Sequence, residues 1–301
     1  MSKTLVWFLL LASWPVAAQS RLNRVIELLE KGTPPLGIFA SNISVRGGAA
    51  VSSSAVDFVI IDLEHSPYDP TRLESYLLGM IDKRRIHEKG ALQPAVAPIV
   101  RLPANGRERV EYMMKQVLDL GAFGVVVPHV RNREDALAAV RGMRFPQRDG
   151  ARDAEPEGHR GVGYGWAARY WGLAAPEYVA KADLWPLDPA GELVLWCMIE
   201  SREGVEHALE IASTPGVSGI FIGPSDLSMS LGVTESDPKT EAAIQKILAA
   251  CKQVRTPCGT LTSGQAVKTR LDEGFQFLAV GGDSGLSGGV ERGLEIGRAK
   301  R

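Results

Sequence analysis

Short apolar runs recur along the chain, and most are followed by a stretch whose apolar residues are spaced at the interval of an α-helix. The runs are rich in Val and Ile and are continuously apolar rather than alternating, which is typical of parallel strands covered on both faces. We count eight runs, at residues 36–40, 58–63, 98–102, 124–128, 193–200, 219–223, 259–262 and 275–280. Their order predicts βα units around a parallel sheet.

Helical spacing is found between the runs, at residues 71–85, 107–120, 133–143, 202–212, 239–253 and 265–273. Asn132 and Ser201 stand where N-caps are expected, and Gly121 and Gly274 stand where helices end. Eight units without a break in composition favour an α/β fold consisting of a single closed (β/α)8 TIM barrel over a doubly wound open sheet. The irregular stretch 145–189 is a long insert after the fourth βα unit, and its length predicts a functional or assembly role.

The composition changes this picture little. The chain has 301 residues, of which 45% are hydrophobic and 23% charged, as in soluble globular proteins, so disordered and collagen-like chains are excluded. The net charge is −1, and we find no dense run of Lys and Arg. Nucleic acid is therefore not expected as a partner.

The first eighteen residues have the pattern of a secretory signal peptide. Lys3 is followed by an apolar run at 5–12 and by the small residues 16–18, which suit cleavage. We therefore expect a mature chain of residues 19–301 that is secreted or periplasmic. A buried or disordered N-terminus is the alternative, and the protein would then be cytoplasmic. The apolar run is shorter than the ~20 residues that cross a bilayer, and no later run reaches that length, so no membrane span is expected.

Polar residues follow almost every predicted strand, where the active sites of such barrels lie. Buried carboxylates are costly unless they are paired or bound to a metal, so several at one mouth predict a cation or a strong partner. The residues in question are Asp62, Glu64, His65, Arg101, His129, Glu200, Ser225, Asp226 and Asp283.

Glu200 and Asp226 end two successive strands and are the predicted metal ligands. Hard oxygen ligands suit Mg²⁺ or Mn²⁺ and leave coordination positions for water and substrate. The alternative is that Glu200 pairs with an arginine such as Arg101, and that Asp226 caps the helix that begins there.

For the other polar and aromatic residues, we either expect a structural role or leave two roles open. His129 stands alone beside an apolar strand, and we interpret it as a structural residue. The segment 281–284 is either a phosphate-binding loop or a tight turn. The aromatic residues Trp166, Tyr170 and Trp171 are interpreted as packing between subunits rather than covering the mouth.

Four segments carry a resemblance to a known family. Residues 57–65 (DFVIIDLEH), 98–103 (PIVRLP), 198–203 (MIESRE) and 219–228 (GIFIGPSDLS) are similar, in this order, to the HpcH/HpaI aldolases, and 160–163 (RGVG) resembles a further family stretch. The similarity extends over roughly residues 22–300. It implies a metal-dependent class II pyruvate aldolase on a (β/α)8 barrel, normally a homo-oligomer, within the superfamily of citrate lyase β subunits and malyl-coenzyme A lyases.

The resemblance also implies a role for individual residues. Glu200 and Asp226 would bind the metal, Mg²⁺ or Mn²⁺ with Co²⁺ or Zn²⁺ as alternatives, and Arg101 would stabilise the enolate oxygen. His65 would be the base, and the backbone N–H of Ser225 would bind the substrate carboxylate, as helix N-termini do. Asp119 matches the acidic partner that raises the basicity of the histidine. Because it ends the helix before the fourth strand, we expect it at the opposite end of the barrel unless a neighbouring subunit supplies it.

These expectations combine into a lyase that acts on a 2-oxo acid, cleaving a 4-hydroxy-2-oxo acid to pyruvate and an aldehyde or running in reverse. No lysine stands at a predicted strand end, so no Schiff base is expected. Family aldolases often have glutamine where this chain has Met198. That departure keeps two alternatives open: a secreted protein that binds a metal or oxo acid without turnover, and an acyl-coenzyme A lyase of the same superfamily.

Overall fold

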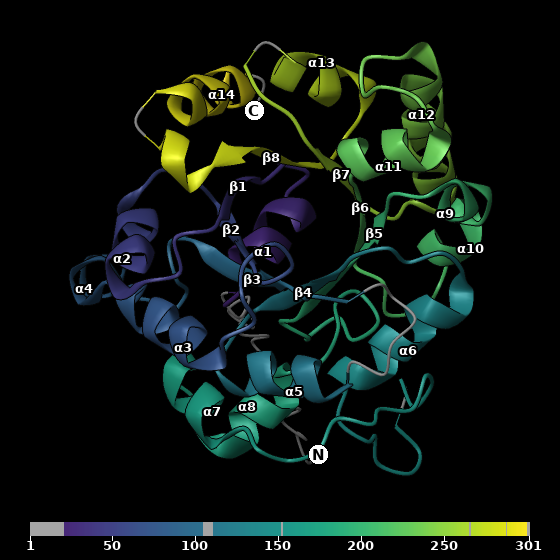
Figure 1. Ribbon diagram of the computed structural model, residues 1–301. Helices are drawn as coiled ribbons and strands as arrows, with labels where there is room; N and C mark the ends of the chain where they lie inside the picture. Colours follow the sequence, from purple (N-terminus) through teal and green to yellow (C-terminus); the bar gives the residue numbers. More distant parts are fainter. Residues whose placement is uncertain (1–20, 105–110, 152, 265, 287, 300–301) are drawn as a thin grey trace, which may run out of the picture.

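Eight parallel strands form a closed barrel in which each strand pairs with the next and β8 pairs with β1 (Figure 1). The computed structural model describes residues 21–104, 111–151, 153–264, 266–286 and 288–299, so the predicted signal segment 1–18 lies outside it. The strands are β1 Leu36–Ala40, β2 Phe58–Asp62, β3 Ala97–Arg101, β4 Gly124–Val127, β5 Val194–Ile199, β6 Gly219–Ile222, β7 Cys258–Leu261 and β8 Phe277–Gly282. The predicted (β/α)8 barrel is confirmed.

Helices surround the strands in Figure 1. Their bounds are α1 Arg24–Glu30, α2 Val45–Ser53, α3 Pro70–Gly79, α4 Lys83–Lys89, α5 Glu111–Asp119, α6 Arg133–Met143, α7 Gly165–Trp171, α8 Ala175–Lys181, α9 Arg202–Glu206, α10 Ala208–Ala212, α11 Pro224–Leu231, α12 Pro238–Val254, α13 Ala266–Glu273 and α14 Gly289–Arg298. Within the described residues, no helix is both long enough and apolar enough to cross a membrane.

The helix predictions hold where caps and spacing agree. The segment predicted at 133–143 is α6, and Asn132 caps it by accepting the N–H of Asp135. The segment predicted at 71–85 is instead divided into α3 and α4, because Asp82 caps a new helix by accepting the N–H of Arg85. Ile81 continues the apolar spacing across that break, so the pattern alone conceals it.

The barrel interior is filled by large side chains, including Trp196, which stacks on Phe277 with ring centroids 4.2 Å apart. The short helix α1 lies at the amino-terminal end, where Val25 and Ile26 pack into this interior. Asn23 at its start donates to the carbonyls of Phe123, directly before β4, and Glu192, two residues before β5. α1 therefore closes the end of the barrel opposite the mouth.

The insert lies at this same amino-terminal end. Its helices α7 and α8 lie outside α5 in Figure 1. Trp171 is buried, stacks on Phe123 with centroids 4.3 Å apart and donates its indole N–H to the Gly121 carbonyl. The interpretation of Trp171 as a residue that packs between subunits is therefore wrong, because its ring lies within its own chain. Trp166 is partly exposed.

Candidate active site

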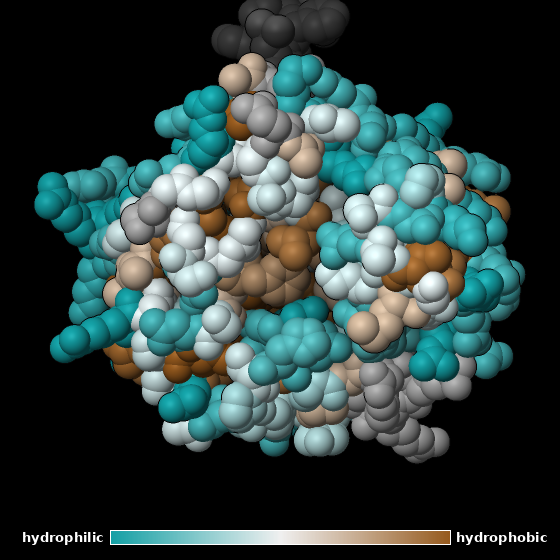
Figure 2. Space-filling model, turned by 45° about the horizontal axis from the view of Figure 1, so that its top comes forward, coloured by the Kyte–Doolittle hydropathy of each residue, from teal (hydrophilic) through white to brown (hydrophobic). Residues whose placement is uncertain are grey.

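A cavity of about 570 Å³ opens at the carboxyl-terminal ends of the strands. Figure 2 shows the molecule hollowed near the centre of that view, with hydrophobic residues inside the hollow and hydrophilic ones around it. Apolar side chains of the cavity include Phe39, Met198 and Phe221. Five of the six predicted site residues line the same cavity: His65, Arg101, Glu200, Ser225 and Asp226.

Arg101 is held by two carboxylates. Asp62 and Arg101 are paired residues of β2 and β3, and the guanidinium binds both oxygens of Asp62 at 2.9 and 2.7 Å. Its Nη1 lies 2.9 Å from Glu64, and the group packs 4.8 Å from the centre of the Phe39 ring. A two-point arginine–carboxylate contact fixes direction as well as distance. The Arg101 guanidinium is therefore oriented before a substrate binds.

Glu200 is buried beside His129, which follows the neighbouring strand β4. His129 adopts the left-handed conformation, with φ 55°, and its backbone N–H donates to Glu200 Oε1 at 2.9 Å. The His129 ring nitrogens lie 3.3 Å from Glu200 and 3.6 Å from Glu64. One ligand atom from each of these three side chains lies within 4.8 Å of the others. They form an arrangement that can surround a single cation.

A bound cation would offset the negative charge of this group. Burial, together with the nearby Glu64 and Asp226, raises the pKa of Glu200 to about 8, although the His129 N–H opposes the change. Burial also raises the pKa of Glu64, and Arg101 opposes it. Both carboxylates are costly to ionise without a partner, and the imidazole of His129 lies between them. Such a set of donor groups suits a divalent metal.

Neither structural alternative for the predicted ligands is seen. Arg101 pairs with Asp62 and Glu64 rather than with Glu200. Asp226 is the third residue of α11, whose N-cap is Gly223, so its side chain is not the cap. Among the described residues, the group of possible ligands at this mouth consists of Glu64, His129 and Glu200, and Asp226 lines the same cavity.

The absence of a side chain at Gly223 leaves room for the Glu200 carboxylate. It follows β6 as Glu200 follows the paired strand β5. A Cβ at Gly223 would lie 2.3 Å from Glu200 Oε2, far inside van der Waals contact. A side chain at this position would therefore displace the carboxylate.

The first turn of α11 faces the cavity with Pro224, Ser225 and Asp226. No side chain caps this N-terminus, and the Ser225 hydroxyl donates to Glu235 at 2.8 Å. Uncapped N–H groups at the start of a helix attract anions. This geometry fits the predicted use of the Ser225 N–H for a substrate carboxylate.

His65 lies at the rim of the cavity. Its side chain is 65% exposed, and its Nε2 is 3.8 Å from Glu64. Its backbone N–H donates to Asp62 at 3.4 Å, so the loop that carries His65 is attached to the carboxylate that orients Arg101. The exposed ring can exchange protons with solvent.

Asp119 lies away from the cavity. It ends α5, just before β4 begins, and its carboxylate binds Arg160 at 2.9 Å and Lys115 at 2.6 Å. Within one chain it therefore lies at the opposite end of the barrel, as its position before a strand predicts. Its role as a partner of His65 requires a second chain.

The segment 281–284 has a structural function. The Asp283 carboxylate accepts the backbone N–H groups of Ser41 and Asn42 at 3.1 and 2.8 Å. A bound phosphate would need these N–H donors, and the Asp283 carboxylate already occupies them. We therefore interpret Asp283 as part of a tight turn. Gly281 and Gly282 line the cavity.

The chain is also similar to known proteins. The family model described as HpcH/HpaI aldolase/citrate lyase matches residues 37–287. The chain belongs to this family.

Other members of the HpcH/HpaI family align with most of this chain. A 5-keto-4-deoxy-D-glucarate aldolase of Citrobacter koseri is 35% identical over 76% of this chain and 78% of its own. The protein of the same name from Salmonella arizonae is 36% identical with the same coverage. A solved HpcH/HpaI aldolase/citrate lyase family protein from Burkholderia cenocepacia has a TM-score of 0.70 and 28% identity, covering 93% of this chain and 96% of that one. The protein is thus a carbon–carbon lyase of a metal-dependent family.

The sequence assigned no catalytic or metal-binding role to Asp62, Glu64 or His129, although each stands at a strand end. Their position at the end of an apolar run is the feature of the sequence that indicates a place at the mouth. Their partners depend on which strands are neighbours and in what register: Asp62 lies opposite Arg101, and His129 lies beside Glu200. The interpretation of His129 as only structural is not supported, because its ring contacts two acidic residues at the mouth.

We expect binding of Mn²⁺ or Mg²⁺ to release protons below pH 8. With a pKa of about 8, Glu200 is mostly protonated at pH 7 without metal, whereas a cation requires the carboxylate. The apparent affinity for the metal should rise about tenfold per pH unit from pH 6 and level off near pH 8.

Calorimetric titration in buffers of different ionisation enthalpy measures the release of protons. Glu203→Gln, in the first turn of α9 and outside the cavity, is the matched control and should titrate like the wild type. A pH-independent affinity would contradict the assignment.

Proposed function

We propose that this HpcH/HpaI family member cleaves a 4-hydroxy-2-oxo acid into pyruvate and an aldehyde, and catalyses the reverse aldol addition. The observation that carries the proposal is the convergence, at one mouth, of an oriented arginine, a solvent-accessible histidine and a group of two glutamates and a histidine around the buried Glu200.

Substrate binding follows from two features of the cavity. The uncapped first turn of α11 offers the Ser225 N–H to the carboxylate of the oxo acid. Arg101 presents a fixed guanidinium to the oxygen that becomes the enolate. Together they orient the bond between C3 and C4 of the substrate within the cavity.

The chain's own residues then move one proton and stabilise one charge. His65 accepts the proton of the 4-hydroxyl, the C4–O bond becomes a carbonyl and the C3–C4 bond breaks. The electron pair of that bond forms the C2–C3 double bond, and Arg101 stabilises the resulting negative oxygen. A proton returned to C3 completes pyruvate.

Glu64, His129, Glu200 and Asp226 are the residues that would hold a divalent cation. When bound, Mg²⁺ or Mn²⁺ supplies Lewis-acid stabilisation of charge on the oxo acid. Among the described residues that line the cavity there is no lysine, which agrees with a mechanism without a Schiff base.

The first substrate to test is 5-keto-4-deoxy-D-glucarate, because relatives at 35–36% identity are named as its aldolases. Numbered from its oxo end, it is a 4-hydroxy-2-oxo acid. The experiment incubates the chain with this compound and Mn²⁺ and follows pyruvate. We expect pyruvate formation that stops on adding EDTA, and no protein adduct on adding borohydride. Failure with this compound and with simpler 4-hydroxy-2-oxo acids would refute the proposal.

Asp119 takes part in this scheme only if a neighbouring subunit brings it to the cavity. The proposal therefore includes a homo-oligomer.

We expect His65→Ala to separate two reactions. Aldol cleavage needs the 4-hydroxyl proton removed and should fall about 10²–10⁴-fold. Decarboxylation of oxaloacetate forms the same enolate without a hydroxyl proton and should fall much less. The two rates are measured on one preparation, together with metal affinity. His87→Ala, on the exposed helix α4, is the control. Equal losses in both reactions would remove His65 as the hydroxyl base.

A further inference from the structure

A second pocket lies at the amino-terminal end of the barrel, opposite the candidate active site. Its lining includes Val56 and Ala95, which come two residues before β2 and β3. It is open to solvent and has a volume of about 280 Å³, and the described residues that line it include no acidic side chain. Its charged residues, from α1, α4 and α14, are Arg24, Arg85, Lys89 and Arg298.

Local contacts hold all four of these cations in place, and Lys89 donates to the side-chain oxygen of Gln93. Arg85 donates to the carbonyls of Ser52 and Ser53 at 2.6 and 3.0 Å, and Arg298 donates to the carbonyl of Ala55. Arg24 binds Asp57 at 3.0 Å. Cations are favoured where a helix such as α2 ends. An arginine has five donors, so these bonds do not exhaust the guanidinium groups.

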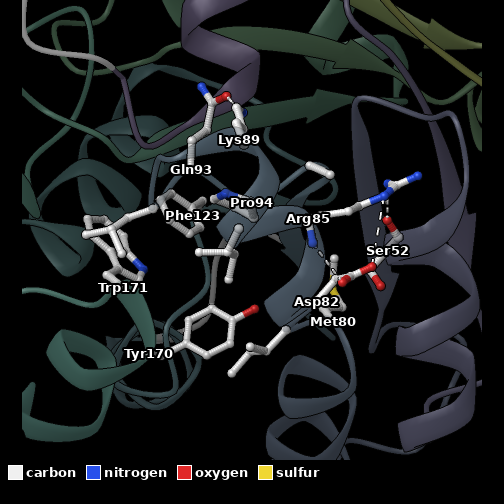
Figure 3. A pocket seen from close by; sticks show the side chains of 14 residues that line it. Ser52, Met80, Asp82, Arg85, Lys89, Gln93, Pro94, Phe123, Tyr170 and Trp171 are labelled. Atoms are coloured by element: carbon white, nitrogen blue, oxygen red, sulfur yellow. Dashed lines mark hydrogen bonds and ion pairs between the residues drawn. The ribbon is translucent and has the colours of Figure 1, made fainter.

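A neighbouring, mainly apolar cavity of about 70 Å³ is lined in part by two of these side chains (Figure 3). It shares Arg85 and Lys89 with the basic pocket and is otherwise lined largely by apolar residues, including Phe123 and Trp171. Figure 3 shows Arg85 leading away from the aromatic rings toward Ser52. Long aliphatic stems pack on apolar surface while their charged ends turn away from it.

The positive charges are not fully compensated. Burial lowers the pKa of Lys89, and Arg24 and Lys31 lower it further, whereas Glu27 opposes them. Arg24 has Asp57 as its acidic partner, and the nearest acidic partner of Arg85 is Asp82 at 3.9 Å. Like charges held this close repel one another, and a bound anion would offset that repulsion.

We propose that the pocket formed by Arg24, Arg85, Lys89 and Arg298 binds a compact polyvalent oxyanion, a phosphate compound or a tricarboxylate. Guanidinium groups contact two oxygens of either class at once. The volume is just below the roughly 300–1,000 Å³ of pockets for drug-sized ligands, which favours a small anion. The site lies at the end of the barrel opposite the metal-binding group and does not depend on the proposed reaction.

The test titrates the full-length, metal-stripped protein with inorganic pyrophosphate and, separately, with tricarballylate, by calorimetry at low ionic strength. Sodium chloride at equal ionic strength is the reference, and melting temperature is the second readout. We expect one equivalent of at least one anion to bind and to raise the melting temperature above that in chloride. Which anion binds distinguishes a phosphate ligand from a carboxylate ligand.

Variants locate the site. Lys89→Gln and Arg298→Gln should each weaken binding about tenfold, as expected for the loss of one charged contact. Arg84→Gln on α4 and Arg292→Gln on α14 remove the same charge from side chains that are 86% and 64% exposed, and should leave affinity within about twofold. The proposal is overturned if neither anion binds, if the control variants lose as much affinity as the site variants, or if the site variants keep wild-type affinity.

Discussion

Glu200→Gln should lose divalent-metal binding, and aldol cleavage should fall at least about 10³-fold. Loss of metal removes several kcal/mol of stabilisation from the charge that develops in cleavage, and about 4 kcal/mol corresponds to 10³ in rate. The substitution keeps the side-chain volume and an oxygen that can accept the His129 N–H. Calorimetry with Mn²⁺ and the rate of pyruvate formation measure the two losses.

The same variant should not be less stable than the wild type when both are free of metal. In the folded chain the pKa of Glu200 is about 8, against about 4.5 when unfolded, so the unfolded wild-type chain holds fewer protons between these values. Wild-type stability therefore falls as the pH rises from about 4.5 to 8, and glutamine avoids that loss. At pH 8 we expect Glu200→Gln to be more stable by about 1–3 kcal/mol. Melting curves at pH 5 and pH 8 measure the difference. Full metal-dependent activity in this variant would remove Glu200 from the metal site.

Arg101→Lys should lower both aldol cleavage and oxaloacetate decarboxylation by about 10²–10³-fold. Lysine keeps one positive charge beside Asp62 and Glu64, which limits the cost of folding, but it cannot reproduce the two-point contact with Asp62. Both reactions need the enolate, so both should fall together, in contrast to the His65 variant. The two rates and the metal affinity are measured in parallel.

Arg101→Ala is less informative by itself, because it leaves the buried Asp62 and the half-buried Glu64 without their partner and is expected to cost about 3–5 kcal/mol of stability. Arg131→Ala, whose guanidinium faces Glu203 outside the cavity, is the control and should keep both activities. Decarboxylation at the wild-type rate in a folded Arg101→Lys protein would remove the guanidinium from the enolate.

The barrel could be predicted from the sequence because strand signals are local. The predicted run 36–40 coincides with β1, and six of the other seven runs begin within one residue of an observed strand; the run at 275–280 begins two residues before β8. The helices α2 and α14 were not predicted, because glycine, valine and serine give them weak helix propensity. Their glycines serve packing: a Cβ at Gly48 would lie 2.2 Å from the Tyr76 carbonyl oxygen, where α2 meets α3.

The site could be predicted in part, because the ends of the strands are also marked by local sequence. Polar residues after apolar runs identify the mouth, and five of the six predicted residues lie there. The contact between Asp62 and Arg101 requires the register of β2 against β3, and the contact between His129 and Glu200 requires a left-handed backbone at His129. Both are properties of tertiary structure that apolar spacing does not encode.

The closure of the barrel by α1 sets a limit on N-terminal processing. The side chain of Arg21 donates to the carbonyls of Pro189 and Gly191, and the backbone N–H of Asn23 donates to Glu192 at 2.8 Å. Cleavage after residue 18, as the sequence predicts, would leave all of these bonds in place. A cleavage five residues further along would remove Asn23, the N-cap of α1, and with it the bonds that attach α1 to the segments before β4 and β5.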